Sequence, residues 1–436
     1  MSSKTFWQHM VLSVGTRLAM IGLRLLRNVL LARILGPSER GLFALLSALP
    51  DLLAAISSGG LNTALGFQAA QQRSMGLLIT QLVVFGCLAA GLLTLCGVLL
   101  VDRFGTDMET ARQLGPLIWI LLLAVPLTIL KSGLLTLHNG DGRVVSFNAL
   151  RLLESLAPLV LFLALFWMWQ TDALQAAVIS WLLGIGVVAI VGWCWLGRFH
   201  QLRLRWDARS HRELLRYSGR SHPDVLFQQV LLRSDYLFIG AFIGSEALGY
   251  YAMATAAAEL LLIVPEAVTT PLMKRLLRQG EGIKQLTPFA LRITATVMFG
   301  ACASMALLGE WLIIGLFGDS YAPAYPALLA LLPGLFGLCY ASILRLDLLG
   351  KNRPGSVSVM MGAGAALNVA LNLLLIPPMG IVGAALASSA AYLVVSLAML
   401  VFYCRISQVS LAHTLFILPS DLARLRPLLM GRDITP

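Results

Sequence analysis

Charged residues are scarce in this sequence, and long apolar runs take their place. Only 12% of the 436 residues are charged, about half the share in an ordinary soluble domain. Hydrophobic residues make up 58%, and the mean hydropathy is +0.82. So little polar surface cannot cover a soluble globule of this size, and the composition equally excludes a disordered or fibrous chain. We therefore expect an all-α membrane protein that crosses the bilayer many times.

The sequence also lacks the motifs of nucleotide, metal and hydrolytic chemistry. No Walker A, GxSxG or HExxH sequence occurs, so direct use of ATP by this chain is excluded. The six histidines show no metal-ligand spacing, and the six cysteines form no CxxC pair. We expect all six cysteines, which lie in apolar stretches, to be small core residues: Cys87, Cys96, Cys194, Cys302, Cys339 and Cys404. No catalytic residue, metal site or bound cofactor is expected.

Twelve apolar runs reach the length of about 20 residues that spans a bilayer. They cover about 10–35, 41–66, 74–101, 114–137, 145–168, 173–197, 217–241, 248–273, 288–317, 323–349, 355–377 and 380–404. The breaks between them are short and carry turn residues, as at Gly36-Pro37-Ser38. These twelve predicted helices divide the chain into an N-terminal six-helix lobe (1–197), a basic linker (198–216), a C-terminal six-helix lobe (217–404) and a tail (405–436).

Lysine and arginine are distributed unevenly between the breaks. When the N-terminus is placed in the cytoplasm, the breaks on that side hold nineteen basic residues, six of them from Arg198 to Arg216. The opposite breaks hold three, Arg40, Arg103 and Arg112. The positive-inside rule therefore predicts a multi-pass protein with both termini in the cytoplasm. The net charge of +11 is explained by topology, so membrane lipids are expected as partners and nucleic acid is not.

A short motif occurs once in each half of the chain. The segment 35–44 recurs at 243–252, an offset of 208 residues, and both copies contain Gly-x4-Gly. The same offset superposes Asp51 on Glu259. An offset of six helices preserves orientation, so the two lobes are predicted to be parallel repeats related by an axis along the membrane normal. Two such lobes with a substrate between them are typical of a transporter.

Ten basic and eight acidic residues fall inside the predicted spans, where each costs about 2.5–3.5 kcal/mol at a helix centre. The first lobe has an excess of bases, and the second an excess of acids. Arg17 and Arg24 lie on nearly one face of the first span, with Arg27 about 60° round. This stripe suits a pyrophosphate or an acidic sugar, although Arg17 could instead snorkel from the span end. The candidate substrate-binding residues are Arg17, Arg24, Arg27, Lys131, Arg151, Arg233 and Arg292.

Three carboxylates inside the spans are candidates for coupling to an H⁺ or Na⁺ gradient, namely Asp51, Glu259 and Glu266. A buried carboxylate can load and release a proton, or ligate Na⁺. Static salt bridges between the lobes are the open alternative. Pro265, between the two glutamates, is expected to weaken the helix there. Arg151 and Glu154, three residues apart, are expected to pair on their own helix.

Three motifs stand at the opening, the middle and the close of the chain. The opening motif is Arg27 with Leu35-Gly36-x4-Gly41-Leu42-Phe43 and Gly59-Gly60-Leu61. The middle motif is Arg233-Ser234-Asp235-Tyr236 before Gly244-x4-Gly249, and the closing motif is Asn368-Val369-x-x-Asn372 with Pro377, Gly380 and Gly383. Together they resemble the motifs of bacterial polysaccharide-repeat-unit flippases. The resemblance covers essentially the whole chain. These proteins form part of the multidrug/oligosaccharidyl-lipid/polysaccharide exporter superfamily.

The resemblance implies a flippase that moves undecaprenyl-pyrophosphate-linked oligosaccharides from the cytoplasmic to the periplasmic leaflet of the bacterial inner membrane. Transport would follow alternating access by H⁺ or Na⁺ antiport, and would supply O-antigen, exopolysaccharide or capsule. A polysaccharide polymerase and a chain-length regulator are the further candidate partners. Two alternatives stay open. The cationic first lobe disfavours a multidrug cation antiporter of the same superfamily, and outer breaks of at most about a dozen residues disfavour a membrane-embedded glycan-assembly enzyme.

Overall fold

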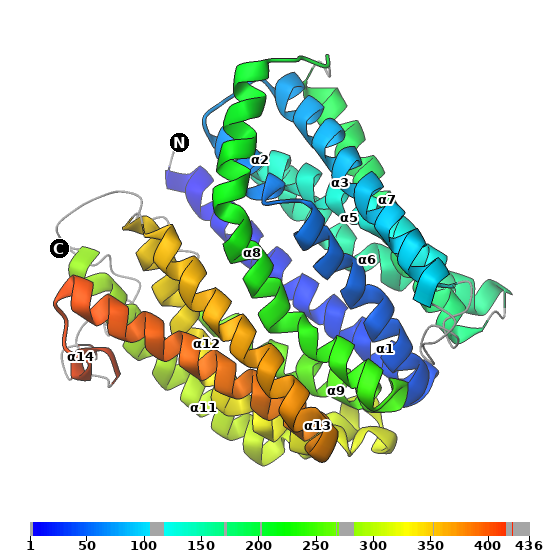
Figure 1. Cartoon of the computed structure of the whole chain (residues 1–436), viewed down its shortest axis with the longest axis vertical. Coiled ribbons are helices and arrows are strands. Elements are labelled where there is room, and N and C mark those ends of the chain that lie inside the picture. Colours follow the sequence, from blue (N-terminus) through cyan, green and yellow to red (C-terminus); the bar gives the residue numbers. More distant parts are fainter. Residues whose placement is uncertain are drawn as a thin grey trace. The chain divides into compact units, whose positions relative to one another are not determined.

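The computed structural model contains helices and no strand in the residues that it describes (Figure 1). These are 3–104, 117–169, 172–200, 203–266, 268–269, 283–351, 353–415 and 421. The all-α class expected from the composition is therefore confirmed. The chain forms two compact units, residues 1–252 and 253–436, which are described separately below as the first and second unit.

The helices follow the predicted spans closely. The first unit contains α1 (Ser3–Ser57), α2 (Leu61–Ala70), α3 (Met75–Phe104), α5 (Leu117–Gly140), α6 (Val144–Trp169), α7 (Ala173–Phe199), α8 (Ala208–Phe242) and the first half of α9 (Ser245–Glu259). The second unit contains the end of α9, η1 (Leu260–Leu262), α11 (Ile283–Phe317), η2 (Asp319–Tyr321), α12 (Ala324–Gly350), α13 (Pro354–Ser407) and α14 (Ala412–Leu415). Most of the predicted tail beyond Leu415 lies outside the described residues.

The two longest helices each contain two predicted spans. Helix α1 has 55 residues and α13 has 54, which at 1.5 Å per residue is about 80 Å, over twice the thickness of a bilayer core. A non-helical glycine divides each, Gly36 in α1 and Gly380 in α13. Within the described residues eight helices can cross a membrane by length and apolarity, or nine if a bent pair counts as one. Helix α8, with eight charged residues, is not among them. The count of twelve stays a prediction.

The first glycines of the two repeated motifs both have a positive φ. Gly36 has a φ of 70° and Gly244 a φ of 117°, values that residues with a Cβ rarely adopt. Each of them stands immediately before the segment that continues into the next predicted span. The repeat seen in the sequence is thus also a repeat of local structure.

The second glycines of the two motifs bring the copies into direct contact within the first unit. A Cβ at Gly41 would overlap the carbonyl oxygen of Ser245, and a Cβ at Gly249 would overlap that of Pro37. Pro37 and Ser245 differ by the repeat offset of 208, so the contact is reciprocal, as at a two-fold interface. The hydroxyls of Ser38 and Ser245 are hydrogen-bonded at 3.0 Å. We call this contact the glycine crossing.

Two further irregularities occur where glycine or proline interrupts a span. The predicted second span is bent, because α1 ends at Ser57 and α2 begins after Gly59 and Gly60, at 67° to it. In α9, a 3₁₀ turn at Leu260–Leu262 precedes Pro265. Proline has no N–H to donate to the carbonyl four residues earlier, so the local weakening expected there is observed.

The cysteines are not all core residues. Cys302 and Cys339 are buried as expected, whereas Cys87 and Cys194 are exposed, so the expectation is wrong for these two. Cys87 lies on α3 beside Leu88, which is 64% exposed. An exposed apolar helix face suits lipid contact, where a thiol behaves as a small hydrophobic group.

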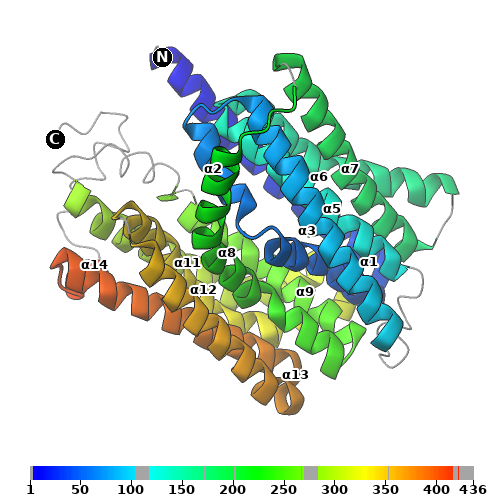
Figure 2. The same ribbon diagram turned by 45° about the horizontal axis from the view of Figure 1, so that its top comes forward.

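In the second unit, α12 and α13 run side by side in both views (Figures 1 and 2). A Cβ at Gly334 of α12 would overlap Ser389 of α13, so only glycine allows this approach. Within α13, the amide of Asn372 donates to Asn368, and the amide of Asn368 donates to Ser388. These buried bonds link the two parts of α13 on either side of Gly380.

Candidate functional site

A three-residue ionic centre joins α5 and α6 in the first unit. The Lys131 ammonium donates to Oε1 of Glu154 at 2.7 Å, and the Arg151 guanidinium donates to Oε2 at 2.9 Å. These helices run from Leu117 to Gly140 and from Val144 to Trp169. Lys131 and Glu154 each lie about 4 Å along the axis from the midpoint of their helix, near the middle of a 30 Å bilayer core.

Helix α1 adds two arginines to this centre. The Glu154 carboxylate interacts electrostatically with Arg24 as well as with its two direct partners. Arg27 lies close enough to Arg24 and Glu154 to interact with both. The cationic stripe predicted on the first span therefore faces the ionic centre, at least for these two positions.

Asp51 and Arg233 complete the group from two other segments. The Asp51 carboxylate interacts electrostatically with Lys131, Arg233 and Arg24. Asp51 is 27 residues after Arg24 on α1, about 40 Å along a straight helix, so the chain must fold back at Gly36 to bring them together. Asp51 itself is exposed.

We refer to these seven residues as the cationic cluster, which comprises Arg24, Arg27, Lys131, Arg151 and Arg233 with the carboxylates Glu154 and Asp51. Among these seven residues the five cations outnumber the two carboxylates. The side chains are only partly covered, since Lys131 is 14% exposed and Arg151 36%. A ligand can therefore reach them. Guanidinium groups bind the oxygens of phosphates in bidentate fashion, so the cluster is suited to hold a multiply charged anion.

The other two predicted binding arginines are Arg292 and Arg17. Arg292 belongs to the second unit and is buried against Asp421, with Nε to Oδ2 at 2.6 Å and Nη2 to Oδ1 at 2.5 Å. The charge of Arg292 is thus paired with that of Asp421 in a bidentate contact. Arg17 is half-buried on α1, two turns before Arg24.

The two predicted glutamates of the second half are exposed and belong to the second unit. Glu259 is the last residue of α9, directly before the 3₁₀ turn, and Glu266 lies just after that turn. Their proposed counterpart Asp51 belongs to the first unit. Of the three candidate coupling carboxylates, Asp51 is the one within the cationic cluster.

The sequence predicts no role for one buried acid, Asp235, beyond its place in the motif Arg233-Ser234-Asp235-Tyr236. Asp235 is 2% exposed, accepts a hydrogen bond from the hydroxyl of Tyr251, and accepts another from the Tyr236 amide at 3.0 Å. The guanidinium of Arg233 lies 5.7 Å from the centre of the Tyr236 ring. Helix α8 is thereby tied to α9 beside the cluster. The signal was present in the sequence as an acid two residues after an intramembrane arginine.

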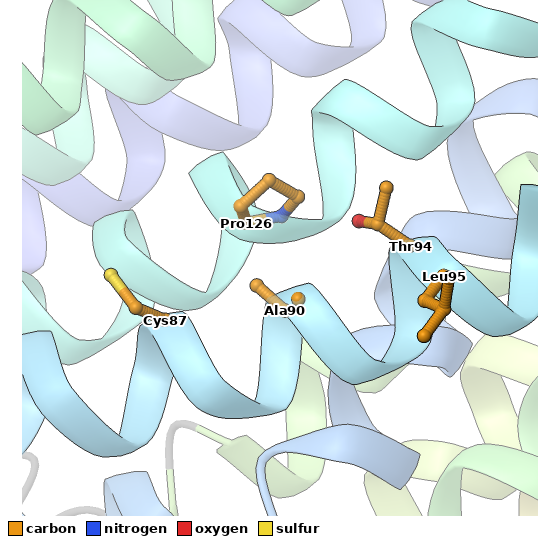
Figure 3. A pocket seen from close by; sticks show the side chains of 6 residues that line it. Cys87, Ala90, Thr94, Leu95 and Pro126 are labelled. Atoms are coloured by element: carbon orange, nitrogen blue, oxygen red, sulfur yellow. The ribbon is translucent and has the colours of Figure 1, made fainter.

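An apolar groove of about 530 Å³ lies between α3 and α5 (Figure 3). Cys87, Ala90, Thr94 and Leu95 line it from α3, and Pro126 lines it from α5. No charged side chain is among its lining residues. The groove is therefore separate in chemistry from the cationic cluster and does not suit an anionic group.

Comparison with solved structures identifies the fold. A lipid II flippase MurJ in an inward closed conformation matches with a TM-score of 0.72 and 15% identity, over 98% of this chain and 94% of that one. An inward-facing multidrug resistance MATE family transporter of the MOP superfamily matches with a TM-score of 0.64 and 14% identity, over 92% and 95%. A MOP superfamily transporter from Pyrococcus furiosus matches with a TM-score of 0.65 and 15% identity, over 92% and 96%. At these identities the likeness shows the fold alone.

Comparison of sequences identifies the family. No curated protein matches the chain. Residues 30–326, about two thirds of the chain, match the family model described as "Polysaccharide biosynthesis protein". This match confirms the resemblance to a polysaccharide biosynthesis family seen in the sequence, and the solved structures confirm the expected fold. The chain belongs to the polysaccharide biosynthesis protein family, and it has the fold of the MOP superfamily transporters.

Proposed function

We propose that this protein is a flippase that moves undecaprenyl-pyrophosphate-linked oligosaccharide repeat units from the cytoplasmic to the periplasmic leaflet of the bacterial inner membrane. The product would supply O-antigen, exopolysaccharide or capsule. The observation that carries this proposal is the cationic cluster, in which four helices place five cations beside two carboxylates at mid-membrane depth. A pyrophosphate linked at both ends carries two anionic phosphate groups, which match such a surplus.

The ionic centre of Lys131, Arg151 and Glu154 explains how the cations are held in position before a substrate binds. Glu154 occupies both Lys131 and Arg151 and so keeps the two cations in place when no substrate is bound. A pyrophosphate brings more oxygens and more negative charge than one carboxylate, so it can compete for the same donors. Arg24 and Arg27 are then available as further donors on the facing helix.

Coupling to an H⁺ or Na⁺ gradient would act through Asp51. Its carboxylate lies among the cations of the cluster, so binding of a proton or Na⁺ there changes the charge that an anionic substrate meets. Glu259 and Glu266 are the second-unit carboxylates to compare with it. An Asp51→Asn variant should hold the substrate but turn over slowly, and should lose its dependence on the ion gradient.

The test is a deletion strain complemented with matched variants. The measured quantities are the surface polysaccharide and the lipid-linked repeat units that remain accessible on the cytoplasmic face of inner-membrane vesicles. Deletion should abolish the polymer while repeat units accumulate on the cytoplasmic face. The Arg24→Gln/Arg27→Gln double variant should behave like the deletion, whereas Arg33→Gln, on the same helix but outside the cluster, should restore the polymer.

Two results would contradict the proposal. Normal polymer in the deletion strain, together with new sensitivity to cationic drugs, would assign the protein to multidrug export. Full complementation by the Arg24→Gln/Arg27→Gln variant, present in the membrane at the wild-type amount, would separate the cluster from the substrate.

A further inference from the structure

The connection between α7 and α8 lies at a membrane boundary. The candidate span of α7 ends at Phe199. Residues 203–205 are fastened to the first turns of the α3 span, because the Arg205 amide donates to the Thr80 hydroxyl at 3.0 Å and the Arg203 carbonyl packs directly on Gly76. This connection is therefore held at the depth where two candidate spans meet water. We call the described residues 198–200 and 203–217 the basic–aromatic patch.

The patch presents a dense positive charge. Its arginines are all exposed, namely Arg198, Arg203, Arg205, Arg209, Arg212 and Arg216. The patch holds two acids, Asp207 and Glu213. Asp207 caps α8 by accepting from the amides of Arg209 and Ser210, and Glu213 is shared between Arg73 and Arg209. Most of the positive charge is thus directed outward.

Large apolar side chains alternate with these arginines. Leu204 is 70% exposed and Trp206 is 67% exposed. Leu204 and Trp206 alternate in sequence with Arg203 and Arg205 in this non-helical segment. The Trp206 ring lies 4.0 Å from the ring of His211, centre to centre. Exposed apolar side chains interleaved with basic ones suit an interface between hydrocarbon and charged headgroups.

We propose that the basic–aromatic patch binds the anionic phospholipid surface of the leaflet that it adjoins. Trp206 and Leu204 would lie at the acyl boundary, and the arginines would bind lipid phosphates. Charge complementarity would equally admit an acidic protein, but the attachment of the patch to the ends of two spans favours the bilayer, which surrounds those ends in every state of the protein. The inference does not depend on what the protein transports, so either proposal can fail without the other.

The test measures contact of Trp206 with lipid in the full-length protein. The protein is reconstituted in phosphatidylcholine vesicles that contain phosphatidylglycerol or phosphatidylcholine brominated in the acyl chain, since bromine quenches nearby tryptophan. The contribution of Trp206, one of nine tryptophans, is the difference between wild type and Trp206→Phe. Brominated phosphatidylglycerol should quench this contribution at a lower mole fraction than brominated phosphatidylcholine.

A matched pair of variants tests the charge. Each arginine near an anionic surface contributes about fivefold to local binding. In Arg203→Gln/Arg205→Gln the mole fraction of phosphatidylglycerol for half-quenching should therefore rise at least about fivefold. Arg353→Gln/Arg405→Gln, which removes two exposed arginines of the second unit, should leave it unchanged. A Trp206 signal that no brominated lipid quenches, or equal quenching by both lipids that the Arg203→Gln/Arg205→Gln variant does not alter, would overturn the proposal.

Discussion

A single methyl group at the glycine crossing should separate two helices that now touch through their backbones. In Gly41→Ala the new Cβ would overlap the carbonyl oxygen of Ser245 and approach the Gly249 nitrogen to 2.8 Å. Both are backbone atoms, which cannot rotate away as a side-chain end can. Overpacking of this kind costs about 1–3 kcal/mol, and the better helix propensity of alanine returns at most about 1 kcal/mol. We expect a net loss of about 2 kcal/mol.

Thermal unfolding of the purified protein measures this loss, with Gly22→Ala as the matched control. Gly22 lies on the same helix, and no atom stands within 4 Å of a Cβ built there, so that variant should be neutral or slightly stabilised. Gly41→Ala should melt about 2 °C lower or more. Gly249→Ala should behave alike because the contact is reciprocal, and Gly41→Ala/Gly249→Ala should cost less than the sum, since the first methyl already opens the space for the second. Equal melting of Gly41→Ala and Gly22→Ala would refute the reasoning.

Two further predictions concern ion pairs. Arg292→Gln should lower the unfolding free energy by about 3–5 kcal/mol, because it leaves the buried Asp421 carboxylate without this partner. The double variant Arg292→Gln/Asp421→Asn should recover part of the loss. Equal melting temperatures of the single and the double variant would contradict this prediction. Partial burial raises the pKa of Asp141, but hydrogen bonds from His200 and Arg143 outweigh it and hold that pKa below its usual range. The carboxylate thus stabilises the fold above about pH 4 and loses this effect as the pH falls through its lowered pKa. Asp141→Asn should cost about 1 kcal/mol at pH 7, and melting curves recorded down to pH 3 should converge with those of the wild type; a difference that does not shrink would contradict the assignment.

The helices could be predicted because a bilayer imposes their length, and the local ion pair could be predicted because its spacing allows it. Arg151 and Glu154 are three residues apart, so one helix turn brings them together. Lys131 is 23 residues from Glu154 and reaches it from another helix, which no spacing rule reveals. The sequence therefore predicted which residues are charged within the membrane, but not that four helices gather five of the cations.

Exposure to lipid could not be predicted from hydropathy. Cys87 and Cys302 both lie in apolar runs, yet one is exposed and the other buried. In water an apolar residue must be buried to be stable, but in a bilayer the lipid tails are as apolar as the protein interior, so the same composition fits both faces. The repeated glycines were more informative, because only a close approach or a positive φ makes glycine necessary at such a position.

The glycine crossing and the cationic cluster are linked through α1. Arg27 lies nine residues before Gly36, and Asp51 lies ten residues after Gly41. At 1.5 Å per residue both are about 14–15 Å from the crossing, one on each arm of the folded helix. The fold-back at Gly36 therefore places the two arms at matching depth, which is why carboxylate and cations interact across 27 residues of chain. A backbone change at the crossing that altered the angle between the two arms would change the distance from Asp51 to Arg24 and Arg27. It would thereby change the electrostatic potential at the cationic cluster, where an anion would bind.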